Sequence, residues 1–497
     1  MITRNPSLAA GQAFDLIIVG GGFYGASLAL ESARRGLKHL LLEAGDFGHA
    51  TSWNSSRIVH GGLRYLQSLD LKRFFESVGE RKWFLRHFPD LVHPLPCVMP
   101  LYGEGVYRPA IFRTALKLND ILSRGRNDGA SQNALGPARV LDAAETVLVF
   151  PEVERQGLQG AAHWLDGAMP DSQRVLIEML HWAAEAGATS LNYVRAEQLI
   201  SSGAQTAGVV ARDTLSGTAL EFRAPVVVNC GGPWCREIAS AFHRDVPGLF
   251  SPALAFNLLL NYKPNFSAAV AVRPRLPGAR TYFLCPWKGL LLAGTYHASC
   301  PQGFQSGAPR EDLVADFVKH LAVAIPGSQL TSSHVLRVHW GFMPARSEGS
   351  WEPSHREVLY VHGDQGGPKG LYSVSGVKLT TARLVAERML RRIVSDSGKQ
   401  LPQPLVDRPR QSAPPPERSA FEALLQNDLR GAQKLVHDII DHEAVVCWDD
   451  LLLRRTDWGS CPIGIDKLRT ELQDLAQRVL SEPRAVALPA AEHSLRR

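Results

Sequence analysis

Residues 15–27, DLIIVGGGFYGAS, decide the fold. A short apolar run ends in three glycines and passes directly into a helical pattern, which predicts a strand, a tight turn and a helix N-terminus. Gly20 would permit the turn, Gly22 would let the backbone approach a pyrophosphate, and Gly25 would let the helix pack close to the sheet. The helix N-terminus would offer free N–H groups and a partial positive charge to the phosphates. The stretch therefore predicts a dinucleotide-binding unit.

An acidic residue ends the next predicted strand, residues 40–43, which read LLLE. Glu43 follows Gly20 by about 20 residues, the spacing at which a carboxylate holds ribose hydroxyls. An acid at this position argues against a cofactor with a 2′-phosphate. The alternative is a glycine turn of structural role followed by an incidental glutamate.

The segment 50–66, ATSWNSSRIVHGGLRYL, is dense in hydroxyls and small residues. Hydroxyls and bare backbone suit a loop that lies along a pyrophosphate and a flavin ring, and a plain nicotinamide enzyme has no need of such a segment. On spacing alone, a polar loop with a Ser or Asn helix cap fits as well. Read with its GGLRYL ending, the segment closely resembles the flavin-dependent glycerol-3-phosphate dehydrogenases, within the wider D-amino-acid-oxidase-like flavoprotein superfamily.

Three later motifs carry the same resemblance. Residues 229–234, NCGGPW, follow an apolar strand, and residues 376–381, GVKLTT, precede a clear helical pattern. Residues 442–456 contain the Arg-Arg-Thr element of the family's C-terminal helical domain. We expect Thr380 or Thr381 to cap the helix after 381, whose N-terminus would stabilise negative charge on the reduced flavin. The resemblance runs from about residue 14 to 460 and is weakest over 245–345.

The resemblance implies FAD as cofactor, hydride transfer from a secondary alcohol to the flavin, and delivery of the electrons to a quinone. The motifs and the resemblance together predict these cofactor-binding residues: Gly20, Gly22, Phe23, Tyr24, Gly25, Glu43, Thr51, Ser52, Ser55, Ser56, His60, Gly61, Gly62, Gly231, Trp234, Gly376, Lys378, Leu379 and Thr380. The predicted catalytic residues are His60, Arg64, Tyr65, His297 and Lys378, and no metal site is expected. His60 has an alternative role as a neutral, hydrogen-bonded histidine under the glycine turn.

The expected fold class is α/β plus α+β: an FAD-binding Rossmann-like domain, an antiparallel-sheet substrate domain and a C-terminal helical domain. The predicted segments are FAD-binding residues 14–100, 166–245 and 351–397, a connecting segment on the substrate side at 101–165, an antiparallel substrate domain at 246–350, a Pro-rich linker at 398–418 and a helical domain at 419–497. Helical patterns cover 70–88, 110–123 and 171–186, and we expect Pro89, Pro94, Pro96 and Pro100 to break the chain.

The chain departs from the family where substrate should lie. The family's Gly-x-Arg-Pro is here Gly341-Phe342-Met343-Pro344, and a methionine cannot form the bidentate contact to a phosphate that an arginine makes. Asn257 stands at a usual histidine position. Arg346 or Arg356 could join Arg64 and Lys378 in holding an anion, and His339 joins His60 and His297 as a base candidate.

Bulk properties narrow the remaining choices. The 497 residues suggest two or three structural units, and the net charge of +6 is compatible with an anionic substrate or an acidic membrane surface. No dense Lys/Arg tract is visible, so we expect no nucleic-acid partner. We also see no apolar membrane span and no secretion signal. The seven cysteines lack a CxxC pair, which favours free thiols in a reducing cytosol.

The leading interpretation is a cytoplasmic enzyme acting on a small molecule, with peripheral attachment to the inner face of the cell membrane, a quinone partner and a homodimer as further options. The alternatives are an FAD dehydrogenase or oxidase for another polyol, hydroxy acid or amine, and a flavin-binding protein without turnover. Because Met343 and Asn257 replace the usual family residues, the sequence does not identify the substrate.

Overall fold

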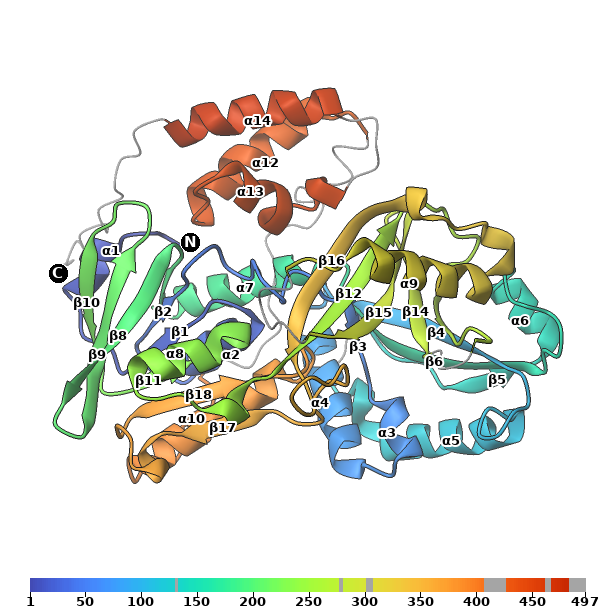
Figure 1. Cartoon of the computed structure of the whole chain (residues 1–497), viewed down its shortest axis with the longest axis horizontal. Helices are drawn as coiled ribbons and strands as arrows, with labels where there is room; N and C mark the ends of the chain where they lie inside the picture. Colours follow the sequence, from blue (N-terminus) through green and yellow to red (C-terminus); the bar gives the residue numbers. More distant parts are fainter. Residues whose placement is uncertain (130–132, 277–279, 301–306, 406–425, 461–465, 482–497) are drawn as a thin grey trace, which may run out of the picture. The chain divides into compact units, whose positions relative to one another are not determined.

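The computed structural model describes residues 1–129, 133–276, 280–300, 307–405, 426–460 and 466–481. The chain divides into two compact units, residues 1–416 and 417–497. The first contains two large sheets (Figure 1). Most of the predicted Pro-rich linker and the C-terminal tail lie outside the described residues.

A six-stranded sheet forms around the predicted glycine turn, in the order β17-β18-β11-β1-β2-β7, with β17 antiparallel to the rest. The strands are β1 (Leu16–Val19), β2 (His39–Leu42), β7 (Thr189–Leu191), β11 (Val227–Asn229), β17 (Val358–Val361) and β18 (Leu371–Ser375). β1 and β2 are buried along their whole length, as expected for inner strands of a parallel sheet covered on both faces. The predicted strand–helix–strand unit is therefore present.

Helices and a small sheet cover this parallel sheet. The central helix α2 (Phe23–Ala33) packs against α7 (Ser172–Glu185) and α10 (Ala382–Asp396). On the opposite face, alternate strand residues such as Ile17 and Leu40 share a core with Val209 and Phe222 of a three-stranded antiparallel sheet. That sheet contains β8 (Val194–Ser202), β9 (Gln205–Asp213) and β10 (Ala219–Arg223), and α1 (Pro6–Ala10) and α8 (Cys235–Phe242) lie beside it.

The second large sheet has nine strands, in the order β16-β12-β15-β14-β13-β4-β6-β3, with β5 beside β6. The strands are β3 (Ile58–Val59), β4 (His93–Leu101), β5 (Arg139–Leu141), β6 (Gly160–Ala168), β12 (Pro252–Leu260), β13 (Ala269–Val272), β14 (Tyr282–Trp287), β15 (Leu290–Ser299) and β16 (Val335–Pro344). It is antiparallel except where β13 pairs with β4. α9 (Glu311–Ala324) was not predicted, and its Phe317 and Leu321 enter the core of this sheet.

Helices surround this sheet and join it to the first. They are α3 (Leu63–Gln67), α4 (Leu71–His87), α5 (Pro109–Leu122) and α6 (Ala143–Val149). Elsewhere in the first unit, 3₁₀ turns lie at Arg124–Asn127, Gly232–Trp234, Pro247–Leu249, Pro326–Ser328, Ser332–His334 and Gly363–Gln365. The second unit is helical, as predicted, in its described part: α12 (Leu429–His442), α13 (Trp448–Asp450), a π-helical turn Leu451–Arg455, a 3₁₀ turn Trp458–Ser460 and α14 (Asp466–Ser481).

The expected chain break is confirmed at Pro89, which follows the end of α4 at His87, but it is wrong at the other three prolines. Pro94, Pro96 and Pro100 lie within β4, which keeps an unbroken nine-residue register with β6. The three prolines are an even number of residues apart, so their missing N–H groups face the same side of the strand. On the other side β13 pairs with β4 only at Cys97 and Val98. β3 and β4 thus belong to the nine-stranded sheet, although we placed residues 14–100 in the FAD-binding domain.

A buried ionic network joins the helices behind the glycine turn. Arg383 of α10 donates to Glu80 of α4 at 3.0 Å and to Glu387 at 2.9 Å, and its guanidinium lies 3.6 Å from Glu31 of α2. Burial raises the pKa of Glu80, while the charge of Arg383 opposes that shift. The arginine therefore pairs with carboxylates from α2, α4 and α10 and links the three helices.

Arg383→Met should destabilise the fold by about 3–5 kcal/mol, because it leaves the buried Glu80 without its cation. Arg391→Met is the matched control, since Arg391 also pairs with Glu387 but is largely exposed. Urea unfolding of both variants, loaded with cofactor, measures the difference. Equal stability of the two variants would contradict a supporting role for the network.

Candidate functional site

A cavity of about 1400 Å³ lies where the carboxyl ends of β1 and β2 meet the nine-stranded sheet. A typical pocket for a small ligand has about 300–1,000 Å³. The larger volume leaves room for a dinucleotide together with a small substrate. Loop 50–66, the turn after β11 and the segment before α10 also line it, so the predicted motifs converge on one site.

The glycine turn has the geometry that its sequence predicts. Gly20 has φ +107°, and a Cβ there would lie 2.5 Å from the carbonyl oxygen of Cys230. A Cβ on Gly25 would lie 1.8 Å from the carbonyl oxygen of Gly20. Gly22 is the N-cap of α2, has no side chain to cap the helix and lines the cavity, so the N-terminus of α2 faces the cavity.

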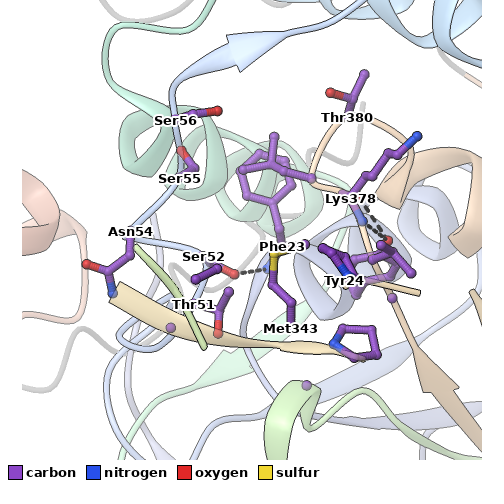
Figure 2. Close-up of a pocket in the computed structure, with 18 of the residues that line it drawn as sticks. Phe23, Tyr24, Thr51, Ser52, Asn54, Ser55, Ser56, Met343, Lys378 and Thr380 are labelled. Carbon is purple, nitrogen blue, oxygen red and sulfur yellow. Dashed lines mark hydrogen bonds between the residues drawn. The ribbon is translucent and has the colours of Figure 1, made fainter. Parts of the chain in front are cut away.

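Side chains support this turn from two directions. The Glu43 carboxylate accepts hydrogen bonds from the backbone N–H of Gly21 at 2.6 Å and of Gly45 at 2.8 Å. Each carboxylate oxygen keeps a further lone pair for a ribose hydroxyl. Ser52 Oγ accepts from the backbone N–H of Phe23 at 2.9 Å (Figure 2). Loop 50–66 is thereby tied to the helix N-terminus.

Tyr24 connects α2 to the segment before α10. Its hydroxyl donates to the carbonyl of Lys378 at 2.9 Å and accepts from the N–H of Lys378 at 3.2 Å (Figure 2). A Cβ on Gly376 would lie 1.8 Å from Tyr24 Cζ, so this position requires a glycine. The capping expectation needs correction, because Thr381 occupies the N-cap of α10 but its side chain makes no capping hydrogen bond.

The structure brings nearly all the predicted residues to the cavity. The lining includes Gly20, Gly22, Phe23, Tyr24, Glu43, Thr51, Ser52, Ser55, Ser56, His60, Gly62, Arg64, Tyr65, Gly231, Trp234, His297, Gly376, Lys378, Leu379 and Thr380. Gly25 and Gly61 do not line it. Gly25 lets α2 pack on the turn, and a Cβ on Gly61 would lie 1.9 Å from Arg81 Nη1.

Three cations line one part of the cavity. Lys378 Nζ lies 4.1 Å from the ring centroid of Tyr65, and Arg280 Cζ lies 3.3 Å from that of Trp351. Within the part of the chain that the structure describes, neither they nor Arg64 form an ion pair with a carboxylate. Burial and the charge of Arg64 lower the pKa of Lys378 to about 8. This part of the cavity is therefore electropositive.

The candidate histidines differ in their surroundings. Burial and the charges of Arg280 and Arg64 lower the pKa of His297 to about 4. His339 is buried opposite Asn257 in the β12–β16 ladder and does not line the cavity, so it is not a base candidate. His60 lines the cavity with 43% of its side chain exposed, and its Nδ1 lies 3.2 Å from Asp166.

Residues that differ from the family pattern also lie at the cavity. Met343 lines it (Figure 2), and Arg346 lines it but is exposed and paired with Glu352. Asn257 donates to the carbonyl of Asn54 at 2.9 Å and accepts from Thr295 at 2.9 Å, so it ties loop 50–66 to β15. Arg356 is not in the lining.

Sequence reasoning missed four residues at this site: Asp166, Arg81, Arg280 and Trp351. None lies in a motif, and Asp166 is 106 residues from His60 in the chain. The available signal was weak: an isolated acid in an apolar run at 160–168 and an arginine just before a strand.

The residues present fit an FAD. The α2 N-terminus suits a pyrophosphate, Glu43 suits a ribose, and the segment 376–380 offers backbone beside the cationic part of the cavity.

Gly22→Val should yield protein without FAD, because its side chain would enter the cavity at the α2 N-terminus, where a Cβ already lies 3.1 Å from Ser52 Oγ. Gly248→Val is the control, since a Cβ there meets nothing within 4 Å. The ratio of flavin to protein absorbance after purification measures occupancy. A full complement of FAD in the Gly22 variant would refute the assignment of this turn.

Comparisons with curated proteins point to one group of enzymes. The chain is 30% identical over 414 residues to a glycerol-3-phosphate dehydrogenase of Synechocystis, covering 80% of this chain and 73% of that protein. It is 30% identical to a mitochondrial glycerol-3-phosphate dehydrogenase of Arabidopsis thaliana, covering 76% and 60%. An alpha-glycerophosphate oxidase of Streptococcus pyogenes is 30% identical, covering 68% and 55%. The matches to the Arabidopsis and Streptococcus proteins thus span less than two thirds of those proteins.

Solved structures share the fold. A glycerol-3-phosphate dehydrogenase from Bacillus halodurans, complexed with FAD, superposes with a TM-score of 0.64 at 18% identity and covers 96% of both chains. An L-alpha-glycerophosphate oxidase from Mycoplasma pneumoniae with FAD bound gives a TM-score of 0.56 at 14% identity, covering 79% of this chain and 97% of that one.

The sequence profile described as FAD dependent oxidoreductase matches residues 15–392. This range includes the glycine turn, both large sheets and the residues that line the cavity. The chain belongs to the FAD dependent oxidoreductase family, and FAD is its cofactor.

Proposed function

We propose that the protein oxidises a secondary alcohol that carries an anionic group, with glycerol 3-phosphate as the leading substrate. The observation that carries the proposal is the set of three cavity cations, Arg64, Arg280 and Lys378, that lack a carboxylate partner among the described residues. Bound FAD supplies the acceptor for the hydride. The names of the curated relatives support the same substrate class.

The cations favour an anion for an electrostatic reason. Partly buried cations that lack a carboxylate partner are unfavourable, and a phosphate or carboxylate would offset that cost through charge-assisted hydrogen bonds. Other arginines at the rim, such as Arg73 and Arg346, already pair with acids. Free positive charge is therefore concentrated where a substrate would bind.

His60 is the group we propose to take the proton of the substrate hydroxyl. A general base works best when its conjugate acid is stable near the working pH. The two arginines near His297 disfavour its protonation, whereas His60 has a carboxylate beside Nδ1. The Nε2 atom of His60 then remains for the substrate.

Met343 supports a second candidate substrate. Without an arginine at this position, the cavity lacks one bidentate guanidinium contact for a phosphate dianion. Arg280 offers a guanidinium from a different part of the cavity. A carboxylate needs fewer donors than a phosphate dianion. An anionic hydroxy acid is therefore the alternative to glycerol 3-phosphate.

Arg280→Met should lower kcat/KM for glycerol 3-phosphate by about 10- to 150-fold, the equivalent of a lost charge-assisted contact of about 1.5–3 kcal/mol. Arg346→Met is the control, because Arg346 lines the same cavity but already pairs with Glu352. Steady-state kinetics of both variants test the proposal, and equal effects would refute it. Met343→Arg then separates the substrates: it should improve turnover of the phosphate and not of a hydroxy acid.

We also propose that the protein docks on a membrane surface through α5 and passes electrons to a quinone there. None of the described helices is both long and apolar enough to cross a bilayer. α5 exposes Ile111, Leu118 and Ile121, while Phe112 and Leu116 are buried. The exposed basic residues Arg113 and Lys117 flank the apolar ones, a pattern that suits an interfacial helix. Phe112 lines the cavity, so this surface adjoins the site.

Replacing Ile111, Leu118 and Ile121 by serine should abolish sedimentation with anionic lipid vesicles, because the apolar face drives insertion into the interface. Leu148→Ser is the control, since Leu148 on α6 is 81% exposed. High salt should weaken binding of the unmodified protein. Undiminished binding of the triple variant would exclude α5 as the docking surface. A homodimer stays a prediction from the sequence.

A further inference from the structure

We propose that Asp166 is a positioning residue that holds His60 as the proton acceptor of the reaction, an inference that rests on the proposed function. Asp166 lies in β6, next to β3, the strand that leads to His60. Its carboxylate is buried, whereas the His60 ring is exposed to the cavity. The pair therefore runs from the protein interior to the place where a substrate would bind.

Three donors and the His60 ring surround the Asp166 carboxylate. Oδ1 accepts from the backbone N–H of Gly61 at 2.7 Å and from Arg81 Nη1 at 2.9 Å. Oδ2 accepts from Trp164 Nε1 at 3.2 Å and lies 3.2 Å from His60 Nδ1. With both oxygens engaged, the carboxylate has one orientation, and that orientation presents Oδ2 to the imidazole.

The contact between Arg81 and Asp166 explains why residue 61 is a glycine. Arg81 reaches Asp166 and the carbonyl of Leu165, the latter at 2.7 Å, by packing directly against Gly61. A Cβ on Gly61 would lie 1.9 Å from Arg81 Nη1. Any side chain at 61 would expel the guanidinium. The Gly61 of the His-Gly-Gly motif thus serves the carboxylate behind His60, not the cavity surface.

Asp166 remains ionised in this environment. Burial by itself would raise the pKa of its carboxyl, but the hydrogen bond with His60 and the charge of Arg81 lower it to about 2. A permanent carboxylate at Nδ1 favours the imidazole tautomer with its hydrogen on Nδ1 and stabilises the imidazolium once Nε2 has taken a proton. Phe283 lies with its ring centroid 5.0 Å from that of His60 and limits rotation of the ring.

The consequence is a division of roles between the two cavity histidines. His60, with a carboxylate behind it, can accept the hydroxyl proton at Nε2. His297, with Arg280 and Arg64 beside it, is the weaker base, and we assign it to orienting the substrate. The hydroxyl proton of the substrate ends on His60, and the substrate carbon becomes a carbonyl carbon as it loses its hydride.

Asp166→Asn tests the inference in FAD-loaded protein by anaerobic single-turnover reduction of the flavin with glycerol 3-phosphate. We expect the limiting reduction rate to fall by about 100-fold, within the range of general-base effects, while the substrate concentration at half-maximal rate changes less than about threefold. Asp213→Asn is the matched control, because Asp213 is a buried, arginine-paired carboxylate outside the cavity. It should react like the unmodified protein.

His60→Ala and the double variant His60→Ala/Asp166→Asn distinguish the role of His60 from that of Asp166. If His60→Ala reduces its flavin at the unmodified rate, the assignment of His60 in the proposed function is wrong. If His60→Ala is slow but Asp166→Asn behaves like Asp213→Asn, the inference about Asp166 is overturned. If both are slow and the double variant is no slower than His60→Ala, the two residues act as one unit, as proposed.

A measurement on the unmodified protein covers the case in which Asp166→Asn does not fold. Histidine-selective ¹⁵N labelling, assigned with His60→Ala, reports which ring nitrogen of neutral His60 carries the hydrogen. The inference requires Nδ1–H. An Nε2–H tautomer would overturn it.

Discussion

The close approach between Gly25 and the carbonyl of Gly20 is the constraint on which the rest of the site depends. Because neither residue has a side chain there, the first turn of α2 lies directly on the end of β1. From this position Tyr24 bonds the backbone of Lys378, and Phe23 bonds Ser52. Two segments more than 300 residues apart in sequence, loop 50–66 and the segment before α10, are thus fixed relative to one helix N-terminus.

The sequence predicts this part well because its determinants are local. A strand, a glycine turn, a helix and an acid follow one another within residues 15–43, and each has its own pattern. The residues around the substrate could not be predicted in the same way. Asp166 and Arg280 reach the cavity only through the pairing of the nine-stranded sheet, which no short motif encodes. The prediction for the prolines of β4 failed for a similar reason. A strand tolerates a proline when the missing N–H is on an edge of the strand that has no hydrogen-bonded neighbour, and the local sequence does not show which edge that is.

The charge arrangement links the two sheets to a function. We propose that the six-stranded sheet and α2 hold the dinucleotide. The nine-stranded sheet brings Arg280 and His297 to the same cavity as Arg64 and Lys378. Positive charge gathers on this side of the cavity, while the buried carboxylate of Asp166 lies behind His60. Such a separation suits a site that binds an anion and removes a proton from a neighbouring hydroxyl. Met343 stands in the cavity lining where the family pattern has an arginine, so we propose that other cations hold the anion.

The most direct test of this account compares substrates that differ only in charge. FAD-loaded protein is mixed anaerobically with glycerol 3-phosphate, with small hydroxy acids and with neutral glycerol, and the loss of flavin absorbance is followed over time. The account predicts rapid, saturable reduction by at least one anionic secondary alcohol and slow, non-saturating reduction by glycerol. Reduction by glycerol with an efficiency equal to that of every anionic compound would contradict it.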